Sequence, residues 1–66
     1  MLKKGMRVNT IYGAGEVVRD TPEIISTRLK RYCVHLDNIP DSFIAMDERN
    51  GGLMFFEDEL EVIKRT

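Results

Sequence analysis

Cysteine, histidine, tryptophan and proline are scarce in this 66-residue sequence. It has no tryptophan, one cysteine, one histidine and two prolines. A single cysteine excludes an internal disulfide and fits a reducing, cytoplasmic location. No apolar run reaches the roughly 18 residues of a membrane span, and residues 1–5 lack the apolar stretch of a signal peptide. We therefore expect a cytoplasmic protein with no membrane partner.

The length allows one small domain, which we assign to residues 1–66. Hydrophobic residues make up 42% of the chain and charged residues 32%, which is typical of a globular protein. So small a domain needs nearly every aliphatic side chain for its core, which leaves little room for a deep substrate cavity. The sequence also offers no acid–base pair, activated nucleophile or cofactor motif. We expect neither catalysis nor a cofactor.

The net charge of −1 hides an uneven distribution. Residues 1–36 carry seven Lys or Arg against three Asp or Glu, whereas residues 37–66 carry three against eight. Such a split can produce a surface with two signs, which favours oriented protein contacts. It argues against a dedicated nucleic-acid-binding domain, which usually carries a clear positive excess. The alternative is that both signs mix on the surface and serve solubility alone.

Turn residues divide the chain into short segments with strand-like alternation. We predict strands at 6–11, 16–20, 31–37, 53–56 and 61–64, with a single 3₁₀ or helical turn at 57–60. Tyr32, Val34 and Leu36 share one face of the clearest strand and are its expected core side. Segment 42–46 is a candidate extra strand, followed by an Asn50-Gly51 hairpin signal.

Residues 23–30 allow two interpretations. They form one helical turn, or they continue two strands around a long hairpin loop, and the Ile-Ile-Ser-Thr run leans towards extended structure. With five or six short antiparallel strands in all, we predict an all-β fold that closes into a small barrel, because closure removes edges that so small a domain cannot protect.

Three segments in order carry a resemblance to known proteins: KGMRVNTIYGAGEVV, RYCVHLDN and GGLMFFEDELEVI. Their order resembles SH3-like barrels of the Tudor/KOW type. It is similar to the small barrel of CarD-type transcription regulators and of transcription-repair coupling factor, and to the C-terminal barrel of UvrD-family helicases. Uncharacterised bacterial and phage proteins that consist of one such barrel also look similar.

The resemblance implies a non-catalytic protein-interaction module in a transcription or DNA-repair complex. RNA polymerase or a repair helicase is the partner that it implies, bound through an added strand or an apolar edge. The relatives attach the barrel to a DNA-binding or motor domain, and this sequence has the barrel alone, so it would bind a partner without acting on DNA itself.

Cys33, His35 and Asp37 alternate on one predicted strand and invite a metal or triad interpretation. Residues two apart on a strand are about 6.5–7 Å apart, so three such side chains cannot share one zinc ion without other ligands. A nucleophile and its base must also approach within hydrogen-bond reach. We expect no metal site and no catalytic residue, and we interpret Cys33 as a small apolar filler.

The glycines also have a structural interpretation. Gly13, Gly15, Gly51 and Gly52 lack the phosphate-loop and dinucleotide spacings, so we expect them to serve turns. An aromatic cage for a methylated cation is disfavoured because Tyr32 lies on the core side.

The candidate partner-binding residues are apolar anchors and electrostatic guides. The anchors are Tyr12, Phe43 and Ile44, and the guides are Arg28, Lys30 and Arg31. Each set also has an ordinary explanation, since Phe43 and Ile44 could cap the barrel end and the cations could be a solvated loop.

Two other functions stay open: nucleic-acid binding in the manner of KOW barrels, and a homo-oligomer that buries Met54 or Phe55. The sequence leaves the oligomeric state undetermined.

Overall fold

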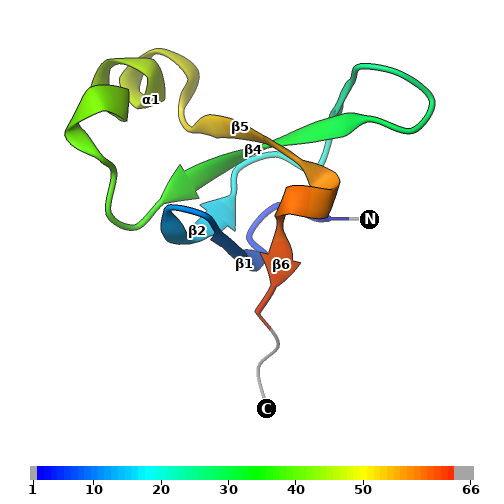
Figure 1. Ribbon diagram of the computed structural model, residues 1–66, viewed down its shortest axis with the longest axis horizontal. Helices are drawn as coiled ribbons and strands as arrows, with labels where there is room; N and C mark the ends of the chain where they lie inside the picture. Colours follow the sequence, from blue (N-terminus) through cyan, green and yellow to red (C-terminus); the bar gives the residue numbers. More distant parts are fainter. Residues whose placement is uncertain (1, 64–66) are drawn as a thin grey trace.

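One long strand, β4 (Lys30–Leu36), is paired along both of its edges in the computed structural model, which describes residues 2–63 (Figure 1). On one edge it pairs with β2 (Gly13–Val17) and β3 (Glu23–Ile24), and on the other with β5 (Leu53–Phe56). Further out, β1 (Arg7–Thr10) pairs with both β2 and β6 (Glu61–Val62). All these pairings are antiparallel, so the described residues form one six-stranded sheet.

Most predicted strands are confirmed, with shifted ends. Segment 53–56 matches β5, and the turn predicted at 57–60 is the 3₁₀ turn η2 (Glu57–Glu59). The strands expected at 6–11 and 31–37 correspond to β1 and β4. The strand expected at 16–20 lies three residues earlier, as β2, so residues 13–15, expected as a turn, belong to this strand. For residues 23–30 the hairpin interpretation is correct. The strand expected at 61–64 is β6, and position 64 lies outside the described residues.

The extra strand at 42–46 is wrong, and the fold is therefore not purely β. The chain forms a second 3₁₀ turn, η1 (Asp41–Phe43), and then a short helix, α1 (Ile44–Asn50). Gly51 ends the helix with a φ of 75°, so the Asn50-Gly51 pair is a helix end rather than a hairpin turn. This helix is the longest element outside the sheet, and no helix in residues 2–63 is long and apolar enough to cross a membrane.

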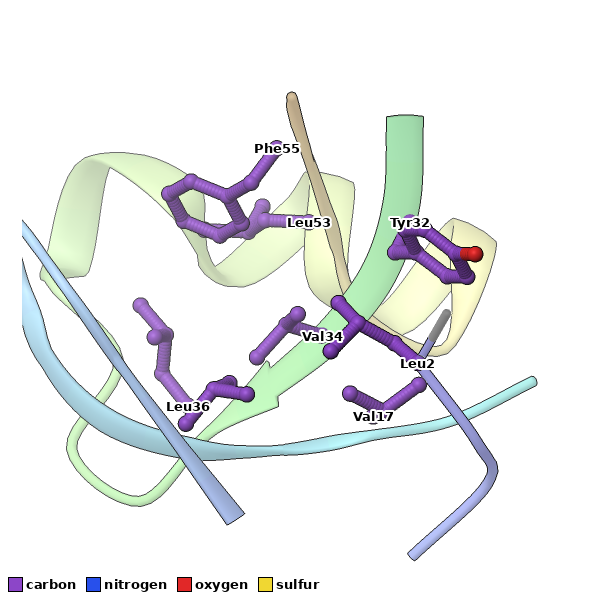
Figure 2. Packing of buried hydrophobic residues seen from close by; sticks show 8 residues of the cluster. Leu2, Val17, Tyr32, Val34, Leu36, Leu53 and Phe55 are labelled. Carbon is purple, nitrogen blue, oxygen red and sulfur yellow. The ribbon is translucent and has the colours of Figure 1, made fainter. Parts of the chain in front are cut away.

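The core lies on the predicted side of β4. Tyr32, Val34 and Leu36 are each at most 1% exposed, as their alternation predicts. Figure 2 shows them packed with side chains from β2, β5 and the N-terminal segment. The buried cluster consists of Leu2, Val8, Val17, Tyr32, Val34, Leu36, Leu53 and Phe55. One side of the strands thus supplies most of the apolar burial that this domain needs.

Gly15 is required for close packing rather than for a turn. A Cβ at this position would lie 2.7 Å from the backbone oxygen of His35 and 2.8 Å from Val34 Cγ1. Both atoms belong to β4, the strand paired with β2, so neither can retreat without disturbing the sheet. Gly13 is the true turn glycine, with a φ of 111°.

We predict that Gly15→Ala destabilises the fold by about 2–3 kcal/mol, because an added methyl group must push β2 and β4 apart. Chemical denaturation would measure the loss. Glu16→Ala introduces the same side chain at the next, exposed position and should cost well under about 1 kcal/mol. Equal costs for the two variants would show that the close approach at Gly15 has no energetic weight.

Candidate interaction site

An apolar pocket of about 260 Å³ opens between the β1–β2 turn, α1 and β5. Only three of its lining side chains carry polar groups. The lining residues are Tyr12, Arg31, Phe43, Met46, Asn50, Leu53, Met54 and Phe55. Pockets for small-molecule ligands usually measure about 300–1,000 Å³, so this one has room for little more than one large side chain.

Three aromatic rings form the apolar side of the pocket. The Tyr12 ring lies edge-on to Phe43 with centroids 5.1 Å apart, and 6.1 Å from the ring of Phe55. These separations fall in the favourable range for aromatic pairs. Phe55 is buried, whereas Tyr12 is 43% exposed, so the cluster joins the core to the surface.

The hydroxyl group of Thr10 positions Tyr12. Thr10 Oγ1 donates a hydrogen bond to the Gly13 carbonyl over 2.9 Å and accepts one from the Tyr12 amide over 3.0 Å. Both bonds close the β1–β2 turn from within, because the hydroxyl serves as donor and acceptor together. This role was not predicted from the sequence, although a threonine at the start of a Gly-containing turn is a known signal for such bonds.

The second feature of the site is the outer edge of β5. Within residues 2–63, β5 pairs with β4 alone. The carbonyl of Cys33 accepts a hydrogen bond from Val18, so Cys33 directs its backbone groups towards the β2 side. Cys33 and Met54 face each other across β4 and β5 and are therefore a non-hydrogen-bonded pair. The backbone N–H and C=O of Met54 point outward.

The backbone N–H of Phe56, two residues further along β5, also points outward because of this alternation. Its amide donates a 2.8 Å hydrogen bond to the carboxylate of Glu59 in η2. That bond occupies the outward N–H of Phe56 and leaves Met54 as the β5 residue with both an N–H and a C=O open for pairing. The open part of the edge lies directly beside the pocket, since Met54 also lines it.

Helix α1 forms the far wall of the pocket and is fixed to the outer face of β4. His35 Nδ1 donates to Asp47 Oδ1 over 3.1 Å, and Asp47 is the single buried polar residue of the described chain, at 8% exposure. One turn later the thiol of Cys33 contacts the carbonyl of Asn50 at 3.9 Å. Two β4 side chains thus hold the helix that presents Met46 and Asn50 to the pocket.

The structure brings together three of the six predicted partner-binding residues. Tyr12, Phe43 and Arg31 all line the pocket. Ile44 is exposed on α1 but does not line it, and Arg28 and Lys30 lie in the β3–β4 hairpin. The sequence analysis missed the contributions of Met46 and Asn50, because it expected a strand or loop where α1 forms.

Arg31 is the charged residue of the pocket lining. Its guanidinium is paired with Glu23 across β3 and β4, through Nε at 2.7 Å and through Nη2. Because this ion pair offsets the charge of Arg31, the rest of the lining is neutral and mostly apolar. The pocket therefore favours neutral apolar side chains.

Cys33, His35 and Asp37 take three separate roles. Cys33 is buried beneath α1, His35 pairs with Asp47, and Asp37 pairs with Arg7 of β1. Burial raises the pKa of the Cys33 thiol, which keeps it protonated and unreactive. No group of three or more His, Cys, Asp or Glu within residues 2–63 is placed to hold a metal ion.

No protein-family model matches this chain, and neither a curated protein nor a solved structure shows significant similarity to it.

The pair formed by Arg7 and Asp37 predicts a pH dependence. The hydrogen bond from the guanidinium lowers the pKa of Asp37, and the same pair raises the pKa of Arg7. A carboxyl group whose folded pKa is depressed adds stability above its unfolded pKa of about 3.9, and loses it as the pH falls through the folded value. We predict that Asp37→Asn lowers Tm at neutral pH and that its difference from wild type shrinks on acidification.

Thermal unfolding followed by circular dichroism at several pH values checks this prediction. Asp41→Asn is the control, because Asp41 is exposed and forms no ion pair within residues 2–63. A Tm difference between Asp37→Asn and wild type that stays constant down to strongly acidic pH would contradict the assignment.

Proposed function

We propose that this chain is a non-catalytic protein-interaction module that binds an extended partner segment along the outer edge of β5. The observation that carries the proposal is the open N–H and C=O of Met54 beside an apolar pocket. Backbone pairing at a sheet edge supplies affinity, and a neighbouring pocket for a side chain supplies specificity.

The partner strand would hydrogen-bond to Met54 and extend the sheet beyond β5. One of its apolar side chains would then enter the pocket against Tyr12 and Phe43. The pocket volume supports a single side chain rather than a small-molecule ligand. The edge also lacks the lysine or proline with which proteins commonly block unwanted pairing, since β5 reads Leu-Met-Phe-Phe.

The fold proposed with this function is an SH3-like barrel. The strand path β5-β4-β2-β1-β6, with a 3₁₀ turn between the last two strands in sequence, supports it. The resemblance to RNA-polymerase-binding barrels supports a cytoplasmic transcription or repair complex as the partner. Nucleic-acid binding is less favoured, because Glu23 pairs with Arg31 and leaves Arg28 and Lys30 as the cations of that patch.

We predict that Met54→Pro weakens capture of the partner about tenfold. Proline removes the outward N–H of Met54 and leaves a partner carbonyl unpaired, which costs about 1–3 kcal/mol. The β4–β5 ladder keeps its own donors, because proline is tolerated where the N–H faces away from the sheet. The measurement is affinity capture from a nuclease-treated bacterial lysate at physiological salt, followed by mass spectrometry and titration of the retained protein.

Met54→Leu is the matched control and should retain the partner, since it keeps both backbone groups and the apolar side chain. A second pair of variants tests whether the partner binds in the pocket or on the exposed surface of α1. Met46→Lys should weaken capture because Met46 lines the pocket, and Ile44→Lys should not because Ile44 does not line it. Identical retention by wild type and Met54→Pro would refute strand addition. In a parallel capture without nuclease, retention that requires intact nucleic acid and falls steeply with salt would favour the nucleic-acid alternative.

A further inference from the structure

The β3–β4 hairpin carries an exposed aliphatic cluster that the pocket does not use. Ile24 is 60% exposed, Ile25 49% and Leu29 42%. The β3–β4 hairpin that carries them projects from the sheet at the end opposite α1 (Figure 1). An exposed apolar cluster on a projecting loop is typical of a contact surface, since a solvated loop needs no such residues.

The backbone of this loop is largely paired within itself. The amides of Ile25 and Ser26 both donate to the carbonyl of Leu29, at 2.8 and 3.2 Å, and the Leu29 amide donates back to Ser26 over 3.3 Å. The amide of Arg28 also lies 3.4 Å from the Ser26 hydroxyl. A loop that satisfies its own polar groups loses less when it leaves water, because fewer N–H and C=O groups become unpaired.

The same hairpin has an unbalanced positive charge. Arg31 is neutralised by Glu23, whereas Arg28 and Lys30 form no ion pair within residues 2–63. These two cations lie on either side of Leu29 in the sequence. The tip therefore combines aliphatic side chains with cationic ones over a few residues.

We infer that this hairpin docks on an anionic lipid surface, with its aliphatic side chains entering the acyl boundary and Arg28 and Lys30 at the headgroups. Anionic headgroups attract both cations, and the acyl layer accepts the aliphatic tip. A nucleic acid would supply the phosphates but no apolar phase. A symmetric contact with a second copy would bring like charges together. The projecting shape suits insertion into a soft layer, and the pocket beside α1 would stay accessible.

This inference goes beyond the proposed function, because it concerns a different surface. It also departs from the expectation of no membrane partner, which rested on the lack of a membrane-spanning segment and does not bear on docking at a lipid surface. The test is co-sedimentation of the chain with vesicles of phosphatidylcholine that contain about one-third phosphatidylglycerol. We expect binding to these vesicles, little binding to pure phosphatidylcholine, and weaker binding as salt rises. Arg28→Gln with Lys30→Gln should lower the partition coefficient about 25-fold, since each cation contributes roughly fivefold.

Ile25→Ser with Leu29→Ser should lower the partition coefficient by a similar factor. The matched controls are Ile11→Ser and Arg49→Gln, which change an exposed aliphatic residue and a cation away from the hairpin and should bind as wild type does. Circular dichroism confirms that each variant is folded. Absence of wild-type binding to the anionic vesicles would overturn the inference. It would favour instead a partner protein with an apolar, acid-rimmed groove that receives the hairpin. Equal losses in the control variants would overturn it as well.

Discussion

Pairing of β4 along both edges is the constraint on which the rest of the structure depends. One edge takes β2 and β3, and the other takes β5. Both faces are also used: Tyr32, Val34 and Leu36 enter the core, while Cys33 and His35 hold α1 on the opposite face. A strand covered on every side has little freedom to slip, because a shift by one residue would exchange its two faces.

The candidate site follows from that arrangement. With β4 fully paired, β5 becomes the terminal strand on its side, and the alternation of an antiparallel ladder turns the backbone of Met54 outward. The pocket forms beside that edge, where the β1–β2 turn, α1 and β5 converge. β4 holds α1 through the His35–Asp47 contact, and Tyr12 of the turn packs against Phe55, which the core holds in place. The site offers an apolar pocket, backbone groups open for pairing and an arginine that is paired with Glu23.

The sequence revealed those parts of the fold that local alternation and turn chemistry control. β4, β5 and η2 were predicted closely, because each has a clear pattern within a few residues. α1 was missed: Pro40-Asp41 marks the start of η1, which leads into the helix, and Gly51 marks the helix end, but a segment of seven residues is too short for periodicity to separate helix from strand. Three of the predicted partner-binding residues line the pocket: Tyr12, Phe43 and Arg31. Their convergence depends on strand register, which the pattern of a single segment does not reveal. The close approach at Gly15 depends on register in the same way.

Amide hydrogen exchange on the free protein shows whether the β5 edge at Met54 is open. The ladder predicts slow exchange for the amides of Leu53 and Phe55, which face β4, and fast exchange for the amide of Met54 between them. The amide of Phe56 should be intermediate, because Glu59 accepts its hydrogen bond on an exposed turn. Strong protection of Met54 in dilute solution would contradict the account, since it would place another bonding partner on the edge that a binding strand must occupy.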